Sequence, residues 1–422
     1  MIKTVGKNIL CLLLEGQVKR LRAKNVFTVV AVAGSLGKTS TKLAIAKTLQ
    51  SQEKVIFQDG NYNDRLTVPL VLFGHKEPAI FDVFAWAKIL LANERQLSKP
   101  FSYNIAVLEL GTDGPGQLEK FAYLHPELFV LTSIAIEHIE FFKTIDAIAQ
   151  EELAPLAFSE TALLNIDDID PMYLPQSPYK SMSVHQHADY SVAKRNQHQL
   201  DPQQLEIKTP GGLLNAEVNL QGKQGAKSAL VAAAIANELG WSSEQIAAGL
   251  AKITPVSGRM QILQGINDTT LIDDTYNAST LAVEAALDTL YGLEAPQRIA
   301  ILGTMNELGE FSEEEHRIVG EHCDPNKLDV VVTIGDVAAQ YLKPTAAAKG
   351  CTVQSFMSPY EAGRYVANVM KPGAVILAKG SQNGVFAEEA LKLLLQYPSD
   401  ANKLVRQSPY WLSVKQKQFP EQ

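Results

Sequence analysis

Short apolar runs alternate with amphipathic stretches along most of the chain. The run Val26–Ala33 is mostly apolar and β-branched, which predicts a buried strand, and Thr39–Leu49 has helical spacing after a glycine-containing turn. Ile145–Ala157 also has the spacing of a helix. Further strands are predicted at Ile105–Leu110, Leu128–Ile134 and Thr161–Ile166. Alternation of this kind is typical of a parallel sheet covered by helices.

The pattern changes at residues 187–220, which are more polar. Two short segments there, Leu205–Lys208 and Leu213–Leu220, alternate between apolar and polar positions. We therefore expect a small antiparallel insertion. A strong helical pattern follows at Ala226–Leu239.

A second α/β series begins after a predicted linker at Pro255, Ser257 and Gly258. Strands are predicted at Thr270–Asp273, Arg298–Leu302, Val330–Ile334 and Ala374–Ala378, and helices at Leu281–Leu290, Ser312–His322 and Phe386–Leu395. The sequence thus predicts two α/β domains, residues 26–256 and 257–422, after an N-terminal segment of residues 1–25.

The N-terminal segment is basic and predicts an amphipathic helix. Six Lys and Arg residues surround the apolar run Ile9–Leu14, opposed only by Glu15. The run is too short for a membrane span, and no cleavage-site pattern of a signal peptide follows it. Two interpretations remain: a helix packed on the next domain, or a helix resting on a membrane surface.

Composition narrows the class of protein. The chain is 46% hydrophobic and 20% charged with a net charge of −8, so it lacks the basic footprint of a nucleic-acid-binding protein. Its three cysteines, Cys11, Cys323 and Cys351, form neither a metal motif nor a disulfide framework. We expect a cytoplasmic protein.

A candidate phosphate site lies between the first predicted strand and helix. It reads Gly34-Ser35-Leu36-Gly37-Lys38-Thr39-Ser40, a shortened form of the P-loop. Glycines let backbone N–H groups surround phosphate oxygens, Lys38 can reach the outer phosphates, and the Thr39 hydroxyl can ligate Mg²⁺. The alternative, a chance glycine-rich turn, fits the strand, turn and helix context less well.

Two further candidates follow predicted strands. Glu109 ends the strand at Ile105–Leu110, at the edge where an open α/β sheet presents ligands, and His138 comes just after a later strand. Either residue alone is more often solvated or structural. Their order after the phosphate loop makes them candidates.

Together these segments resemble the Mur ligase family over residues 26–395. Two of them, Asp273–Ala278 and Leu302–Gly309, are most similar to the branch that adds D-alanyl-D-alanine. The motifs, in family order, are Ala33–Ser40, Gly60–Asp64 with Val68–Pro69, Glu109–Gly111, His138–Glu140, Leu164–Asp168, Gly258–Arg259, Asp273–Ala278, Leu302–Gly309 and Lys379–Ser381.

The resemblance implies a P-loop ATPase domain followed by a Rossmann-like α/β ligase domain, and an ATP- and Mg²⁺-dependent enzyme. ATP would phosphorylate a carboxylate, and an amine would displace the phosphate to form an amide bond. Lys38, Glu109, His138, Glu152 and Arg259 would be catalytic. Phosphates would bind at Gly34, Ser35, Gly37, Lys38, Thr39 and Ser40, and Mg²⁺ at Thr39, Glu109 and His138. Arg259, Asp274, Tyr276 and Asn277 would hold the nucleotide, and Asn61, Asn63, Lys379 and Ser381 the substrates.

The implied substrates are a muropeptide-type acceptor and D-alanyl-D-alanine. Two alternatives stay open: a ligase of the same mechanism acting on a folate-like or amino-acid-polymer acceptor, and a nucleotide-binding partner subunit that has lost catalysis. The oligomeric state is not indicated by the sequence.

The chain departs from the family pattern at several positions. Only residues 1–25 precede the first strand, where the family carries a UDP-binding domain, so we expect that domain to be absent. Asp64, Arg65 and Thr67 replace the family's Asn, Glu and Gly. Ser228 replaces an Asn expected near the nucleotide, and Thr304 replaces an Asp.

The fourth departure concerns the position 14 residues after His138. The family usually has a lysine there, which CO₂ converts to a carbamate that helps position Mg²⁺, whereas this chain has Glu152. We expect Glu152 to supply that carboxylate permanently, as a further metal ligand. The alternative is a solvent-exposed Glu, like its neighbour Glu151, on a helix surface.

Overall fold

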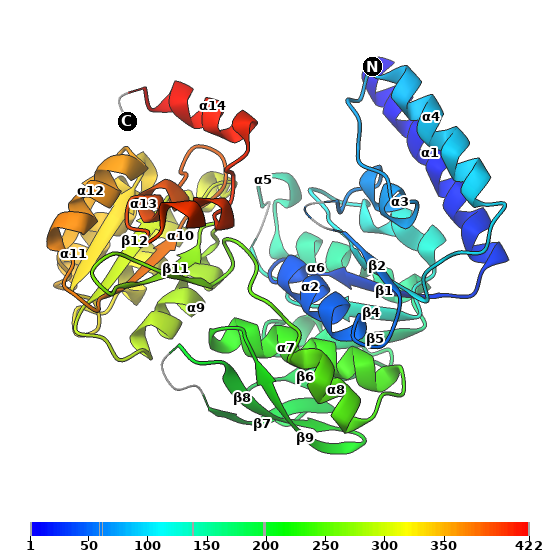
Figure 1. Cartoon of the computed structure of the whole chain (residues 1–422), viewed down its shortest axis with the longest axis horizontal. Coiled ribbons are helices and arrows are strands. Elements are labelled where there is room, and N and C mark those ends of the chain that lie inside the picture. The colour runs from blue at the N-terminus through cyan, green and yellow to red at the C-terminus, as the bar shows by residue number, and fades with distance from the viewer. Residues whose placement is uncertain (1, 59, 61, 137–138, 197–199, 421–422) are drawn as a thin grey trace. The chain divides into compact units, whose positions relative to one another are not determined.

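The computed structural model describes residues 2–58, 60, 62–136, 139–196 and 200–420. These residues form two compact units, described separately below (Figure 1). The first comprises Met1–Asn196, Gln204–Val218 and Ala226–Ile253; the second comprises Gln197–Gln203, Asn219–Gly225 and Thr254–Gln422.

The first unit is built on a nine-stranded sheet in the order β2-β3-β1-β4-β5-β6-β7-β8-β9. Pairing is parallel from β2 to β7, and β8 runs antiparallel to β7. The strands are β1 (Thr28–Ala33), β2 (Val55–Phe57), β3 (Ile105–Glu109), β4 (Leu128–Leu131), β5 (Thr161–Asn165), β6 (Lys180–Ser183), β7 (Tyr190–Asn196), β8 (Gln203–Thr209) and β9 (Gly212–Val218).

The strand register places the candidate site residues at one edge of this sheet. Val32 of β1 lies opposite Glu109 of β3, and Ala33 lies opposite Leu131 of β4. Because these strands are parallel, the segments that follow all three begin at the same edge. The glycine-rich loop leaves β1 at this edge.

Helices surround the sheet of the first unit. They are α1 (Ile2–Lys24), α2 (Lys38–Leu49), α3 (Thr67–Leu72), α4 (Val83–Gln96), α5 (Ile139–Phe142), α6 (Ile145–Leu153), α7 (Gly222–Glu238) and α8 (Ser243–Leu250), with 3₁₀ turns η1 (Leu118–Leu124), η2 (Ala154–Phe158) and η3 (Pro171–Tyr173). Within the described part of the chain, no helix is both long and apolar enough to cross a membrane.

The N-terminal segment forms the helix α1, which lies alongside α4 (Figure 1). Leu10, Cys11 and Leu14 of α1 share an apolar cluster with Trp86 and Ile89 of α4. The prediction of a packed N-terminal helix is confirmed, whereas α4 itself was not predicted from the sequence.

The second unit contains a six-stranded sheet in the order β10-β11-β15-β12-β13-β14. Only the pair β10–β11 is antiparallel. The strands are β10 (Gln261–Gln264), β11 (Thr270–Asp274), β12 (Arg298–Gly303), β13 (Val330–Ile334), β14 (Val353–Phe356) and β15 (Val375–Lys379).

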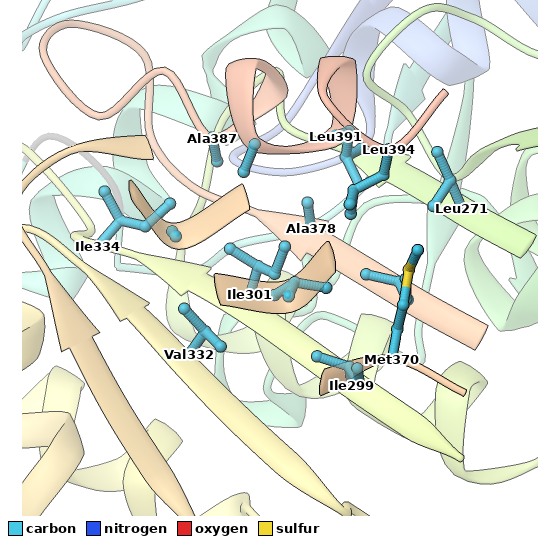
Figure 2. Packing of buried hydrophobic residues seen from close by; sticks show 14 of the residues in the cluster. Leu271, Ile299, Ile301, Val332, Ile334, Met370, Ala378, Ala387, Leu391 and Leu394 are labelled. Atoms are coloured by element: carbon cyan, nitrogen blue, oxygen red, sulfur yellow. The ribbon is translucent and has the colours of Figure 1, made fainter. Parts of the chain in front are cut away.

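Helices flank this second sheet and close its core. They are α9 (Thr280–Tyr291), α10 (Ser312–His322), α11 (Lys343–Ala348), α12 (Pro359–Val369), α13 (Glu388–Lys392) and α14 (Pro409–Gln418), with short turns η4 (Gly309–Phe311), η5 (Ala338–Leu342) and η6 (Pro398–Lys403). Figure 2 shows Ile301, Val332 and Ala378 of the sheet in one cluster with Leu391 and Leu394.

Several element boundaries differ from the sequence-based prediction. The helix expected to reach Ala157 ends at Leu153, because Pro155 lacks the N–H that an α-helix needs and a 3₁₀ turn follows. The strand expected from Val26 begins at Thr28, and Val26 is fully exposed. The expected antiparallel segment is present, since β8 pairs antiparallel with β7, and its strands extend the nine-stranded sheet.

Candidate active site

The glycine-rich loop is fastened to the segment after β4. Gly34 has a φ of +125°, and a Cβ atom there would approach Thr132 Oγ1 to 2.3 Å, so only glycine fits. The Ser35 N–H donates to the Ser133 carbonyl at 3.0 Å, and the Ser35 hydroxyl donates to the Ala135 carbonyl at 3.1 Å. These hydrogen bonds fix the conformation of the loop before α2 begins.

The lysine of the loop is folded back over the loop itself. Lys38 Nζ donates to the carbonyls of Gly34 at 2.5 Å and Ser35 at 3.1 Å. Gly37, with a φ of +81°, precedes Lys38 and lets the chain enter α2. Ser40, half-buried in the first turn of α2, completes the predicted phosphate segment. The ammonium group therefore lies against the backbone of the loop.

Three side chains, those of Thr39, Asn63 and Gln58, are hydrogen-bonded to Glu109 at the end of β3. Glu109 Oε1 accepts from the Thr39 hydroxyl at 3.2 Å and from Asn63 Nδ2 at 3.1 Å. Gln58 braces the Glu109 backbone, since its side-chain oxygen accepts from the Glu109 N–H at 3.1 Å. The structure thus brings together Thr39, Asn63 and Glu109, which lie far apart in the sequence.

The other oxygen of Glu109 lies beside a buried lysine that was not predicted. Lys42 Nζ is 3.2 Å from Glu109 Oε2, and both side chains are almost completely buried. Among the described residues this oxygen has no partner that meets hydrogen-bond geometry, although the ion pair is close. The ion pair is the main interaction of this oxygen, because burial leaves the two charges little solvent to screen them. A buried carboxylate oxygen without a hydrogen bond suits an incoming cation.

Glu152 is buried beside the phosphate loop. Its Oε2 accepts a hydrogen bond from the Gly34 N–H at 2.7 Å, and the residue is 4% exposed. The alternative of a solvent-facing Glu152 is therefore wrong. Its carboxylate reaches the first residue of the loop, so helix α6 delivers a negative charge to the place where the phosphates are expected.

Glu151 is also buried, which corrects the expectation that it lies on an exposed helix surface. Its carboxylate accepts from the backbone N–H groups of Gly116, Gln117 and Leu118 at 2.5 to 2.8 Å. It also accepts from the Thr112 hydroxyl at 3.1 Å. Glu151 thus stabilises the turn that leads into η1 and has a structural role.

Two candidate residues of the first unit, Asn61 and His138, lie outside the described residues. The adjacent position in the metal motif, Ile139, begins α5. Ser228 is described and lies buried in α7. The ammonium of its neighbour Lys227 donates to both carboxylate oxygens of Asp168 at 2.7 Å. These bonds fix the motif after β5 against α7.

The second unit carries its own cluster at the ends of β11 and β15. Lys379 Nζ donates to Asp274 Oδ2 at 2.6 Å and to the Asn277 carbonyl at 2.9 Å. Lys379 is 3% exposed. Lys379, expected to contact substrate, is thereby joined to the predicted nucleotide residues Asp274 and Asn277 and fixes the backbone between them.

Arg259 stacks on Tyr276. Its guanidinium carbon lies 4.2 Å above the centroid of the tyrosine ring, a cation–π arrangement. Within the part of the chain that the structure describes, Arg259 Nε is buried and has no hydrogen-bond partner. An unsatisfied buried donor costs free energy, so a ligand oxygen at this position would be favoured.

The turn that carries Arg259 is bonded to the turn after β11. The Gly258 N–H donates to Asp273 Oδ2 at 3.0 Å, and the Met260 N–H donates to Asp274 Oδ1 at 3.1 Å. Burial raises the pKa of Asp273 to about 6, although the hydrogen bonds from Thr275 lower this pKa. The predicted nucleotide residues on both turns therefore form one bonded group.

Thr304 and Ser381 lie just after the adjacent parallel strands β12 and β15. The Ser381 hydroxyl accepts from the Asn306 N–H at 2.9 Å, and the residue is 1% exposed. The Thr304 hydroxyl donates to the Ile334 carbonyl at 3.3 Å. Thr304, which replaces an Asp of the family, thus has a local structural partner.

Arg406, which was not predicted, holds the backbone that carries the predicted nucleotide-binding residues. Its guanidinium donates to the carbonyls of Thr275 at 2.5 Å and Tyr276 at 3.1 Å. Both oxygens of the buried Glu388 accept from the same guanidinium, and Lys415 Nζ lies 2.9 Å from Glu388 Oε1. The chain after β15 thereby fixes the backbone on which Tyr276 is carried.

We expect Arg406→Ala to lower the free energy of unfolding of this unit by about 3 to 5 kcal/mol, because it leaves Glu388 with one buried cation instead of two. Urea unfolding, followed by far-UV circular dichroism, measures the change. Lys403→Ala is the matched control, since Lys403 is half-exposed and pairs only with Asp400. A loss no larger than that of the control would contradict the supporting role of Arg406.

The residues that sequence reasoning missed share one property. Lys42, Gln58 and Arg406 touch the site through a carboxylate or a backbone carbonyl of another residue. Only Lys42 carried a local signal, since it falls one helical turn after Lys38 in α2.

Comparisons with known proteins agree with this arrangement. A family model described as the Mur ligase middle domain matches residues 32–236, and one described as the Mur ligase, glutamate ligase domain matches residues 258–382. The UDP-N-acetylmuramoyl-tripeptide–D-alanyl-D-alanine ligase of Haemophilus influenzae is 30% identical over 331 residues, covering 76% of this chain and 66% of that protein.

Two other similarities cover more of the chain. The ligase of the same name from Bacillus subtilis is 27% identical over 379 residues, covering 88% of this chain and 76% of that protein. The MurF ligase of Thermotoga maritima in complex with ADP aligns with a TM-score of 0.75 at 22% identity, covering 92% of this chain and 83% of that structure. The structural likeness supports the fold, and two consecutive family models match more than three quarters of the 422 residues. This chain therefore belongs to the Mur ligase family.

Proposed function

We propose that this chain is an ATP-dependent ligase that forms an amide bond through an acyl phosphate, joining D-alanyl-D-alanine to a muramoyl-tripeptide acceptor. The observation that carries the proposal is the group formed by the glycine-rich loop, Thr39 and Glu109 at one sheet edge. The substrates are those named for the relatives from Haemophilus influenzae and Bacillus subtilis.

The loop is suited to hold the phosphates of ATP. The N–H groups at the start of α2 provide a favourable dipole for anions, and the Lys38 ammonium lies against the same loop. When ATP binds, Lys38 would exchange its bonds to Gly34 and Ser35 for phosphate oxygens. Its charge would then stabilise the transferred phosphoryl group.

The donors around Glu109 fit Mg²⁺. The Thr39 hydroxyl and the Glu109 carboxylate are hard oxygen ligands, and Glu109 Oε2 is buried without a hydrogen bond among the described residues. Bound Mg²⁺ would neutralise charge on the phosphates. Asn63 would keep Glu109 oriented, and Lys42 would balance its charge in the absence of the cation.

The second unit carries nucleotide-binding candidates of its own. Arg259 and Tyr276 offer a stacked cation and ring, and Asp274 is held rigid by Lys379. We assign residues 26–256 to a central ATP-binding domain and residues 257–422 to a C-terminal ligase domain. The enzyme would act in the cytoplasm, where its three free cysteines would stay reduced.

Phosphate release from ATP by the purified chain tests the proposal. The expected result is release that requires both a muramoyl-tripeptide acceptor and D-alanyl-D-alanine. Release that requires a folate-like or poly-amino-acid acceptor instead would reassign the substrate and keep the mechanism. ATP binding without release under any acceptor would favour a non-catalytic partner subunit.

A further inference from the structure

The paired helices α1 and α4 carry an exposed apolar face. Large apolar side chains on it include Leu12 at 60% exposure, Val83 at 72% and Phe84 at 90%. The full set of large exposed apolar residues on and just before these two helices is Ile9, Leu12, Leu13, Phe81, Val83, Phe84 and Leu91. Single exposed apolar residues are ordinary, but a cluster of this size on two adjacent helices marks an interaction site.

Helical spacing places these residues on one common side of the pair. On α1, Leu10 and Leu14 face α4, while Glu15 reaches Arg65 on the sheet side. Ile9, Leu12 and Leu13 occupy the remaining side of α1.

The same division holds for α4. Leu90 and Glu94 contact Gln17 of α1, while Asn93 bonds His75 on the sheet side. Val83, Phe84 and Leu91 lie on the side that is left. The helices run in the same direction, because Gln17 of α1 bonds the carbonyl of Leu90 in α4, and Lys24, further along α1, bonds the carbonyl of Leu97 just after α4. Because α1 and α4 lie side by side (Figure 1), helical spacing places the two sets of exposed apolar residues on neighbouring helices.

The same helices carry an unusual charge. Residues 2–24 and 83–96 hold eight of the 38 Lys and Arg but two of the 46 Asp and Glu, a formal charge of +6 against −14 for the rest of the chain. Both acidic residues are paired within the unit, Glu15 with Arg65 and Glu94 with Arg20. Lys19 and Lys88 are exposed near the apolar face.

We propose that the outer face of α1 and α4 binds the surface of an anionic lipid bilayer. Apolar side chains that enter the acyl boundary, flanked by lysines that meet acidic headgroups, are what such a surface recognises. The proposal is independent of the ligase activity.

A second copy of the chain fits this face less well. In a two-fold symmetric contact the same patch meets itself, so two helix pairs of charge +6 would be placed together. Like charges brought together at an interface weaken association. A bilayer with acidic headgroups offers an apolar interior and the opposite charge at once.

Vesicle flotation with the purified full chain tests the proposal. We expect the chain to float with phosphatidylglycerol-containing vesicles, and to stay largely unbound with pure phosphatidylcholine. The triple variant Leu12→Gln, Leu13→Gln, Phe84→Gln should lose roughly tenfold or more in binding. The pair Lys19→Gln and Lys88→Gln should lose about tenfold or more, and this effect should shrink at high salt.

The matched control is Leu213→Gln, Leu281→Gln, Met357→Gln, which removes three other exposed apolar residues outside the two helices. It should bind vesicles as the parent does. Circular dichroism checks the fold, and Phe84→Gln alone replaces the triple variant if that variant unfolds. Parent protein that fails to float with anionic vesicles, or equal binding by triple and control variants, would overturn the proposal. A dimer in sedimentation velocity that the triple variant dissolves, without vesicle binding, would assign the face to self-association.

Discussion

Lys38→Ala is expected to lower acceptor-dependent phosphate release by about 10³-fold while the fold stays intact. Lys38 is the lysine of the glycine-rich loop, and its ammonium donates to the carbonyls of Gly34 and Ser35. The charge that builds on the phosphoryl group would lose its nearest protein counter-charge. Steady-state phosphate release measures the effect, with thermal unfolding as a check on the fold.

The matched control for this experiment lies on the same helix. Lys47 lies in the last turn of α2, where its ammonium lies 5.7 Å from the centre of the Phe57 ring. Lys47→Ala should release phosphate at close to the parent rate. If both variants kept the parent rate, the glycine-rich loop would not be the phosphate site.

Glu152→Gln is expected to lower turnover by about 10- to 100-fold, because it removes a negative charge beside the loop and preserves the shape of the side chain. The amide oxygen can still accept from the Gly34 N–H, so the loop should keep its conformation. Activity of the parent should not change when dissolved CO₂ is removed, since Glu152 needs no carbamate. Both rates come from the same phosphate-release assay.

Glu151 cannot serve as the control for this variant, because it caps the Gly116–Leu118 turn and its loss would disturb the fold. Glu160, exposed at the start of β5, is the better comparison. Glu160→Gln should leave turnover unchanged. Equal turnover of both variants and the parent would return Glu152 to a purely structural role.

The fold could be predicted from the sequence because most strands are buried on both faces. Fully apolar runs such as Val330–Ile334 and the amphipathic Ser312–His322 match their observed bounds. The helix α4 was missed because its signal depends on a partner. Its residues Val83, Phe84 and Leu91 are exposed apolar positions that blur the periodicity, and the packing against α1 lies about 75 residues away in sequence.

The candidate site was predictable where a motif sits at a strand end, and not where side chains meet from different elements. The loop, Thr39 and Glu109 follow from strand order and the edge at which parallel strands present ligands. Burial of Glu152 and Glu151 did not follow, because a two-residue acidic pair on a helix is usually solvated. The support from Arg406 depends on a long-range contact that the local pattern does not encode.

The departures at Asp64 and Arg65 have a structural explanation in the N-terminal helix. Arg65 binds both oxygens of Glu15, and Lys7 Nζ lies 3.2 Å from Asp64 Oδ2. Asp64 also accepts from the Thr67 N–H and hydroxyl, which begins α3. Asp64 and Arg65, two of the positions that differ from the family pattern, therefore both attach α1.

Asn63 and Arg65 are two residues apart, and their side chains bond different parts of the first unit. Asn63 holds Glu109, while Arg65 holds α1 through Glu15. One short segment thus belongs both to the group proposed to bind Mg²⁺ and to the anchor of the basic helix. Thermodynamic linkage is reciprocal, so a cation or nucleotide that shifted this segment would change the affinity of α1 for a bilayer by the same factor by which the bilayer would change the affinity for that ligand.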